Sequence, residues 1–398
     1  MSKVAILINS LKIGGAEKQA INEAILYLKL GYNPVFFLLE NDQTLAYTTP
    51  EVPVIYCSRT IPGIKSILKW IVLPFSAPKI LKNISHHSIS DIVVHCNRAA
   101  AAACIARIFR RNVHIHLILH SYPTENSWIF QLIYRFFLIT VTRRFSSLHA
   151  LSPALAREMT KKIFKQVIYI PPILTEFSKT ASSTFFRKSK QNSLFALEEL
   201  IKNKNKKFIC FTCARLVPIK RIQDIISAIH AVNQSTKKNK PRCKLIIAGT
   251  GLCAGRLSEL VNTLHCEDDI VFAGEVFFTA PLFINADTYI CSSQREGLPL
   301  SILEALYHGC PIITSNASSA ISELFSQKKT DIHYENYTET NSALIYEPCD
   351  VSGLKAALLR MRTDPKLRIL LAKNGKKKAA QFSISSLKQD YSSLLQYS

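Results

Sequence analysis

The sequence has few acidic residues, no long apolar run and no Gly-x-Gly-x-x-Gly motif. Its 28 Asp and Glu stand against 50 Lys and Arg, which gives a net charge of +22 at pH 7. The missing glycine motif counts against a nicotinamide-dependent dehydrogenase. Because every apolar stretch is shorter than the roughly 18–20 residues of a spanning helix, we expect any membrane contact to be made from one side.

The N-terminus also lacks the features of a secretory signal. Five apolar residues, 4–8, are followed at once by the polar pair Asn9 and Ser10, and a signal peptide needs a longer apolar core. We therefore expect a cytoplasmic protein whose eleven cysteines are reduced thiols. The length of 398 residues predicts two or three domains, and the 48% of hydrophobic residues excludes a wholly disordered chain.

The positive charge is concentrated in residues 59–165, which hold 16 Lys and Arg against three acidic residues. Segments 64–75 and 128–145 interleave these charges with Trp, Phe, Ile and Leu, a composition typical of surfaces that lie on anionic lipid. Residues 129–142 are equally compatible with a buried core helix. A basic chain also suggests nucleic acid as a partner, but no segment resembles a nucleic-acid-binding module, so we expect none to bind.

Short apolar runs alternate with longer amphipathic segments in both halves, which predicts βα units around parallel sheets. In the first half, strands are expected over 4–8, 34–39, 92–95, 114–119, 148–152 and 167–170, with a helix over 16–30. In the second half, strands are expected over 208–212, 244–248, 270–272, 288–291 and 311–314, with helices over 222–232, 255–264 and 300–307. We therefore predict an α/β chain with two Rossmann-like domains, 1–174 and 208–375, joined by a polar linker over 175–207. Ligands of such domains bind at the carboxyl ends of the strands, facing the cleft between them.

Three strand-to-helix junctions carry candidate binding residues. Gly15 precedes the first helix, where glycine permits close approach and the helix N-terminus attracts anions. Arg215 and Lys220 project from one loop, a forked guanidinium beside an ammonium, which suits a diphosphate. Gly249 ends another strand and offers a backbone N–H to a base or phosphate. Each feature alone is equally typical of a tight turn or a solvated loop.

A fourth junction is more specific. Glu296 precedes the turn Gly297-Leu298-Pro299, and a helix follows with Glu304 in its first turn or so. The helix N-terminus would favour an anion, while the two carboxylates accept hydrogen bonds from hydroxyl groups. The arrangement suits a sugar that is attached to a phosphate.

The Glu-x7-Glu spacing of Glu296 and Glu304 resembles that of retaining glycosyltransferase family 4. The loop 214–220 and the turn 14–17 fit the same order, and the resemblance covers almost the whole chain. It implies a GT-B fold whose N-terminal domain binds the acceptor and whose C-terminal domain binds the nucleotide sugar, with a final helix over about 376–398 crossing back. It also implies transfer with retention, a nucleotide sugar as substrate, and no metal or other cofactor.

The resemblance assigns the donor diphosphate to Arg215 and Lys220, with Gly15 reaching it through its backbone. Glu304 would bind the ribose hydroxyls, and Gly249 would line the same donor site.

The resemblance places the reacting sugar next to Glu296, which would hold its hydroxyls beside Gly297 and Leu298. His120, which ends the expected strand 114–119, matches a histidine that faces this sugar. No carboxylate nucleophile is evident on the N-terminal side, which favours a front-face mechanism over the two-carboxylate scheme of glycosidases. Segment 315–323 departs from the family pattern by lacking its glycines and proline, and a polar insertion follows over 327–340.

These expectations describe a hexosyl- or N-acetylhexosaminyltransferase that uses a UDP- or GDP-linked donor. Its acceptor would be lipid-linked or a glycan at the inner face of the cell membrane, in the assembly of surface polysaccharide or lipopolysaccharide. Two alternatives remain open: a glycosyltransferase with a soluble sugar-phosphate acceptor, and a non-enzymatic protein that binds nucleic acid through its charge.

Overall fold

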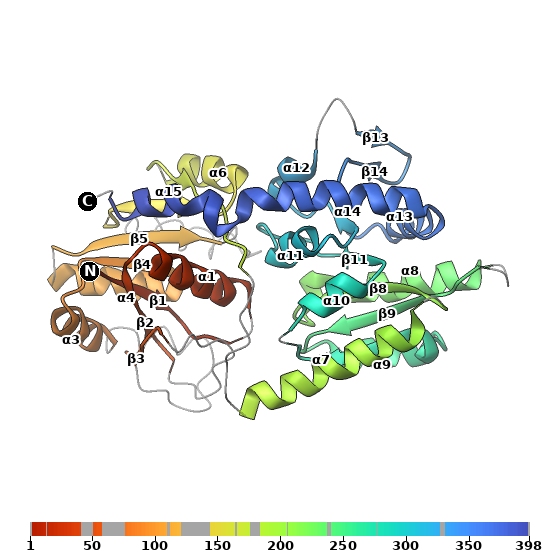
Figure 1. Cartoon of the computed structure of the whole chain (residues 1–398), viewed down its shortest axis with the longest axis horizontal. Helices are drawn as coiled ribbons and strands as arrows, with labels where there is room; N and C mark the ends of the chain where they lie inside the picture. The colour runs from red at the N-terminus through yellow and green to blue at the C-terminus, as the bar shows by residue number, and fades with distance from the viewer. Residues whose placement is uncertain are drawn as a thin grey trace. The chain divides into compact units, whose positions relative to one another are not determined.

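The computed structural model of the chain separates into two compact units, Met1–Phe185 with Phe382–Ser398, and Phe186–Gln381. Each unit has its own β-sheet with helices on both sides (Figure 1). The structure describes residues 2–12, 14–40, 51–57, 76–109, 112–120, 144–163, 165–175, 184–204, 206–236, 240–276, 278–326 and 331–396.

The first unit contains a parallel sheet of seven strands in the order β3-β2-β1-β4-β5-β6-β7. Its strands are β1 Lys3–Ile8, β2 Asn33–Leu38, β3 Val54–Tyr56, β4 Asp91–His95, β5 His114–Leu119, β6 Ser147–Ala150 and β7 Ile168–Tyr169. Its helices are α1 Gly15–Lys29, α3 Ala77–His87, α4 Asn97–Phe109, α6 Pro153–Ile163 and α15 Ile384–Leu394. All six strands expected in this half are confirmed, because long crossovers between apolar strands permit only parallel pairing.

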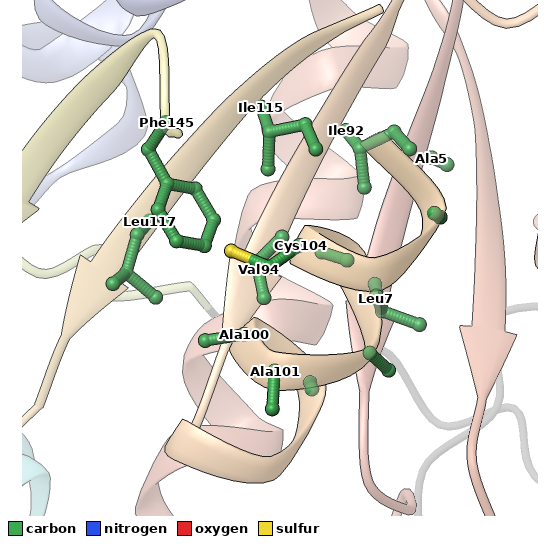
Figure 2. Close-up of a cluster of buried hydrophobic side chains, with 14 of the residues drawn as sticks. Ala5, Leu7, Ile92, Val94, Ala100, Ala101, Cys104, Ile115, Leu117 and Phe145 are labelled. Atoms are coloured by element: carbon green, nitrogen blue, oxygen red, sulfur yellow. The ribbon is translucent and has the colours of Figure 1, made fainter. Parts of the chain in front are cut away.

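One face of this sheet packs against α4, whose inner surface consists of small residues. Ala100, Ala101 and Cys104 of the helix lie over apolar side chains of β1, β4 and β5 (Figure 2). The buried partners labelled there are Ala5, Leu7, Ile92, Val94, Ile115, Leu117 and Phe145. Because alanine side chains are short, the helix backbone can lie close to the sheet.

The opposite face combines buried apolar side chains, such as Ile6, with polar ones, since alternate residues of a strand point to opposite sides. The C-terminal helix α15 is tied to this unit by short contacts. The hydroxyl of Tyr391 donates to the carbonyl of Pro171 at 2.9 Å, and the N–H of Leu174 donates to the carbonyl of Phe382 at 2.8 Å. The last residues of the chain therefore belong to the first unit, although the whole second unit separates them from the rest of it in the sequence.

The second unit has eight strands in the order β10-β9-β8-β11-β12-β15-β14-β13. The strands are β8 Phe208–Cys213, β9 Cys243–Ala248, β10 Ile270–Gly274, β11 Thr288–Cys291, β12 Ile312–Ser315, β13 Ile332–His333, β14 Thr338–Glu339 and β15 Leu344–Tyr346. The helices are α7 Thr184–Asn203, α8 Ile222–Gln234, α9 Ala254–Thr263, α10 Ala280–Asn285, α11 Leu300–His308, α12 Ser319–Phe325, α13 Val351–Thr363 and α14 Pro365–Ala379, with short 3-10 turns η2 Pro218–Lys220, η3 Glu267–Asp269 and η4 Ala380–Phe382. The five strands and three helices expected here are confirmed. The described part of the polar insertion forms the hairpin β13–β14, which adds antiparallel strands to the edge of the parallel sheet.

The predicted linker 175–207 differs most from the structure, because Thr184–Asn203 is the helix α7. Its inner side is secured by Ala196 and Leu200, four residues apart and fully buried. Glu199 adds an ion pair with Lys244 of β9 at 3.0 Å. The polar composition that suggested a linker therefore belongs to the outer side of a packed helix.

All eleven cysteines are free thiols. Cys210 and Cys213 have Cys-x-x-Cys spacing on β8, but residues three apart on a strand point to opposite faces and cannot pair. Among the helices in the described ranges, none has an apolar run long enough to cross a bilayer.

Candidate functional site

The loop after β8 is held in place by the loop after β11. Ser292 donates its hydroxyl to the carbonyls of Lys220 and Arg221 at 2.8 and 3.1 Å. Arg221 has a left-handed backbone with φ of 51°, and its guanidinium forms two 2.9 Å hydrogen bonds with the carboxylate of Asp224. The N–H of Gln294 adds a 2.8 Å bond to the carbonyl of Ile219. These contacts orient the Lys220 side chain towards the β11 loop.

Lys220 and Glu296, both predicted from the sequence, meet directly in the structure. The ammonium group of Lys220 donates to Oε1 of Glu296. The same oxygen accepts the hydroxyl of Ser293 at 2.7 Å. This point beyond the strands therefore combines a cation and a carboxylate that are fixed by neighbouring loops.

The turn at Glu296 and Gly297 rests on the segment that departs from the family pattern. The N–H of Glu296 donates to the carbonyl of Ala317 at 3.2 Å, and the hydroxyl of Ser318 donates to the carbonyl of Gly297 at 2.7 Å. Ser318 also caps α12 by accepting the N–H of Ile321 at 3.3 Å. Serine thus provides a side-chain bond that a glycine at this position would not.

Glu304 lies just past the first turn of α11, close to where it was expected. The helix begins at Leu300 after the N-cap Pro299, so Glu304 is in the second turn. Its Oε2 accepts the hydroxyl of Thr279 at 3.4 Å. Leu298 is half-buried in the turn before the cap.

Gly249 has a structural reason to be glycine. Its φ is +140°, and a Cβ would lie 1.9 Å from the carbonyl oxygen of Ala214. Its N–H already donates to the carbonyl of Gly274 at 2.6 Å. The expectation that this N–H faces a ligand therefore needs correction: the glycine lets the β8 loop pass close to β9. Arg215 is exposed on that loop.

Gly14 and Gly15 differ in the surroundings that a side chain would meet. A Cβ on Gly14 would lie 2.2 Å from Oε2 of Glu17, whereas a Cβ on Gly15 would meet no described atom within 4 Å. Because the flexible Glu17 side chain can move aside, packing requires a glycine neither at Gly14, the N-cap of α1, nor at Gly15, the first helical position. Close approach of a ligand to this backbone is a sufficient reason for the second glycine.

His120, directly after β5, ends a chain of buried polar groups. Its Nε2 lies 2.8 Å from Nδ1 of His95, and Nε2 of His95 lies 3.2 Å from Oε2 of Glu23 on α1. Burial, and then the neighbouring His95, hold the pKa of His120 well below its ordinary range. His120 is therefore a neutral imidazole at neutral pH.

Neither Glu23 nor His95 was predicted as a site residue. Glu23 is a charged residue on α1, yet its side chain is fully buried. Gln19, four residues before Glu23, donates its amide to Oε1 of Glu23 at 3.0 Å. The Gln-x-x-x-Glu spacing on one helix face was the available signal.

A second polar chain lies at the other end of the same sheet face. Asp91 Oδ1 is 3.2 Å from Nε2 of His116, and Nδ1 of His116 is 2.7 Å from the hydroxyl of Ser147. The same hydroxyl is 2.7 Å from Nε2 of His149. Burial, and then His116, lower the pKa of His149 to about 3. Because Asp91, His116 and Ser147 lie at or near the starts of their strands, this chain is remote from the carboxyl ends where His120 lies.

Two sets of groups therefore lie at strand ends, one in each unit. The first unit provides the N-terminus of α1 and a neutral imidazole; the second provides an ammonium group and two carboxylates. Within the described ranges, no three His, Cys, Asp or Glu side chains converge as metal ligands would. Metal independence stays a prediction.

Residues 196–378 match the family model of glycosyl transferases group 1. Over 98% of both chains, the protein is 22% identical to the N-acetylgalactosamine-N,N'-diacetylbacillosaminyl-diphospho-undecaprenol 4-alpha-N-acetylgalactosaminyltransferase of Campylobacter jejuni. A shorter similarity, 28% identity over 141 residues, links it to the alpha-monoglucosyldiacylglycerol synthase of Streptococcus pneumoniae, covering 35% of this chain and 31% of that one.

Two solved structures resemble the chain over its full length. HepE of Anabaena, in complex with UDP and glucose, has a TM-score of 0.75 at 19% identity, covering 100% of both chains. The sucrose-phosphate synthase of Thermosynechococcus elongatus has a TM-score of 0.77 at 15% identity, covering 100% of this chain and 98% of that one. The chain has the GT-B fold, as predicted, and the cleft between its domains stays a prediction.

Proposed function

We propose that the protein is a retaining glycosyltransferase of family 4 that transfers a hexose or N-acetylhexosamine from a UDP- or GDP-linked donor. The acceptor is a lipid-linked or glycan substrate at the cytoplasmic face of the membrane, in the assembly of surface polysaccharide or lipopolysaccharide. The observation that carries the proposal is the contact of Lys220 with Glu296 beyond the strands of the second unit, inside the segment 196–378 that matches glycosyl transferases group 1.

The chemistry of sugar transfer fits the groups of the second unit. A departing nucleotide diphosphate gains negative charge in the transition state, and fixed cations and helix N-termini stabilise such charge without reorganisation. Lys220 is held by its loop for this task, with Arg215 exposed on the same loop. Glu296 and Glu304 accept hydrogen bonds from hydroxyl groups, here those of the donor sugar and the ribose.

Support for a lipid-linked acceptor comes from relatives and from the first unit. The Campylobacter jejuni relative is named for a diphospho-undecaprenol substrate, and the Streptococcus pneumoniae relative for a diacylglycerol product. At the end of α4, Ile108 and Phe109 are 52% and 69% exposed, and Arg110 and Arg111 follow in the sequence. Exposed apolar side chains beside paired arginines suit the boundary of an anionic bilayer.

The test of the enzymatic proposal is transfer itself. Purified protein is incubated with UDP- and GDP-linked hexoses and N-acetylhexosamines, and with a polyprenyl-diphosphate sugar or a sugar phosphate as acceptor. Transfer with retained anomeric configuration, detected by NMR of the product, supports the proposal. Transfer only to the sugar phosphate supports the soluble-acceptor alternative, and nucleic-acid binding that survives Glu296→Gln and Glu304→Gln without any transfer supports the non-enzymatic one.

The membrane contact is tested by flotation with vesicles of phosphatidylglycerol and phosphatidylcholine. The wild type is expected to float with these vesicles and to remain behind with phosphatidylcholine alone. The double variant Ile108→Ser, Phe109→Ser is expected to lose most of this binding. Leu252→Ser, at a site in the second unit that is 93% exposed, is the matched control and should float like the wild type. Equal loss in both variants, or no flotation of the wild type, rejects the contact.

A further inference from the structure

The polar chain that ends at His120 begins deep inside the first unit. Glu23 and His95 both have completely buried side chains. A buried carboxylate is costly unless it is paired and hydrogen-bonded, and here both oxygens have partners, Gln19 and His95. Gln19 and Glu23 lie on α1 and His95 ends β4, so the contact of His95 with His120 connects all three to the site.

The direction of the hydrogen bonds follows from a backbone group whose role is certain. The N–H of Ile173 donates to Oε1 of Gln19 at 3.0 Å, so the amide nitrogen of Gln19 points the other way. That nitrogen donates to Glu23 at 3.0 Å and to the hydroxyl of Tyr391 at 2.8 Å, and the hydroxyl donates to the carbonyl of Pro171 at 2.9 Å. Glu23 therefore receives a donor on Oε1, and as a carboxylate it accepts on Oε2 as well.

The proton positions on the two histidines follow in turn. An accepting Oε2 of Glu23 requires the proton of His95 to be on Nε2. When His95 is neutral, its Nδ1 carries the lone pair and accepts from Nε2–H of His120 across the 2.8 Å contact, whereas a doubly protonated His95 would donate there instead. The same rule leaves the lone pair of His120 on Nδ1. Each ring thus fixes the tautomer of the next.

We propose that Glu23 and His95 are positioning residues that hold His120 as its Nε2–H tautomer and present the lone pair of Nδ1 at the carboxyl end of β5, as an acceptor for a hydroxyl group. That the hydroxyl belongs to the donor sugar rests on the proposed function; the tautomer itself does not. A histidine in this state orients a hydroxyl by accepting its proton in a hydrogen bond, and it does not donate to that group.

The wild-type protein provides the first test. The full-length chain is labelled with ¹⁵N-histidine, and long-range ¹H–¹⁵N spectra assign each ring nitrogen as protonated or bare. His120→Gln and His95→Gln identify the two rings by the signals they remove. The expected result at neutral pH is a bare Nδ1 and a protonated Nε2 on both rings. A protonated Nδ1 on His120 would overturn the proposal, whether or not any variant folds.

Glu23→Gln provides the second test, because it keeps the shape and changes the direction. Its Oε1 still accepts from Gln19, but an amide N–H replaces the oxygen that faces His95. The chain is then expected to reverse, so that Nδ1 of His120 becomes protonated. Asp91→Asn is the matched control, since Asp91 contacts His116 in the second polar chain and should leave His95 and His120 unchanged. An unchanged His120 in folded Glu23→Gln contradicts the proposal.

Transfer assays separate the two proposals. Once a donor has been identified, Glu23→Gln is expected to lower kcat by about tenfold or more, because it reverses the tautomer of His120. Asp91→Asn leaves this tautomer unchanged and should retain kcat. If the spectra show the expected tautomers but no nucleotide sugar is used, the function fails and the positioning role stands. If transfer occurs and Glu23→Gln reverses the rings without changing kcat, the lone pair has no part in the reaction.

Discussion

The ammonium group of Lys220 is ion-paired with the carboxylate of Glu296, 76 residues further along the chain. The two side chains are only 18% and 14% exposed, so water screens the pair weakly. The cation expected at the donor diphosphate is therefore neutralised before a donor arrives. A diphosphate must compete with Glu296 for Lys220, and the two residues lead to opposite predictions for nucleotide binding.

Lys220→Ala is expected to weaken binding of UDP or GDP by about 10- to 100-fold, because a hydrogen bond to a charged group contributes roughly 1.5–3 kcal/mol. The measurement is thermal shift against a nucleotide series. For the wild type, a ligand at about 100 times its Kd stabilises by roughly 2.7 kcal/mol, and the variant should lose most of this shift. Lys207→Ala is the control, since Lys207 pairs with Asp269 at 3.0 Å elsewhere in the same unit. An equal loss in the control would indicate general damage.

Glu296→Gln is expected to retain or strengthen binding of free UDP or GDP, because it removes the anion that competes for Lys220. Transfer of the sugar should fall by about 10²-fold or more, the usual cost of losing one preorganised polar group. Isothermal calorimetry with the nucleotide and initial rates with the nucleotide sugar measure the two effects. Loss of nucleotide binding comparable to that of Lys220→Ala would contradict this division of roles.

Two glycines make a matched pair for separating fold from function. Gly249→Ala places a Cβ against the carbonyl oxygen of Ala214 at a φ that favours glycine, so it should lower the free energy of unfolding by about 1–3 kcal/mol or more. Gly15→Ala meets no described atom and should leave stability within about 0.5 kcal/mol, as surface substitutions do. Chemical denaturation gives both values. If Gly15→Ala leaves donor binding unchanged, no ligand approaches that backbone closely.

The two sheets could be predicted because parallel strands that are buried on both faces are continuous apolar runs in the sequence. Strands such as 4–8 and 288–291 are read directly from such runs. Lys220 and Glu296 were each predicted from strand-to-helix junctions, but their direct contact was not, because it depends on β8 and β11 being neighbours in the sheet. Helix α7 was predicted as a linker because its sequence is largely polar and only a few apolar residues form its buried side.

The Glu23 chain could not be predicted from apolar periodicity. Glu23 is buried because His95 and Gln19 compensate its charge, and these partners come from a strand 72 residues away and from the same helix. A hydrophobicity pattern shows only whether a residue is apolar, so it cannot show that a buried charge has hydrogen-bond partners elsewhere in the chain. The same holds for Ser318, whose bond to Gly297 is visible only once the turn and α12 are placed together.

The low pKa of His149 predicts loss of stability in mild acid. Burial, and then His116, lower this pKa to about 3, whereas an unfolded histidine has a pKa of about 6.5. Between these values the unfolded state binds more protons, so the free energy of unfolding falls as the pH decreases from about 6.5, by up to roughly 1.4 kcal/mol per pH unit for one histidine. His120, with its pKa also lowered, acts in the same direction. Burial raises the pKa of Asp91, but its hydrogen bonds and the nearby histidines outweigh burial and lower it, so Asp91 contributes only at the acid end.

His149→Gln is therefore expected to reduce the slope of stability against pH between about 6 and 4 by close to one proton. Glutamine retains a hydrogen-bonding group for Ser147 without titrating. Urea unfolding of the wild type and the variant is followed by far-UV circular dichroism at each pH. His86→Gln, at an exposed position of α3 in that unit, is the control and should retain the wild-type slope. An unchanged slope in His149→Gln would mean that His149 takes up its proton in the folded protein as readily as in the unfolded chain.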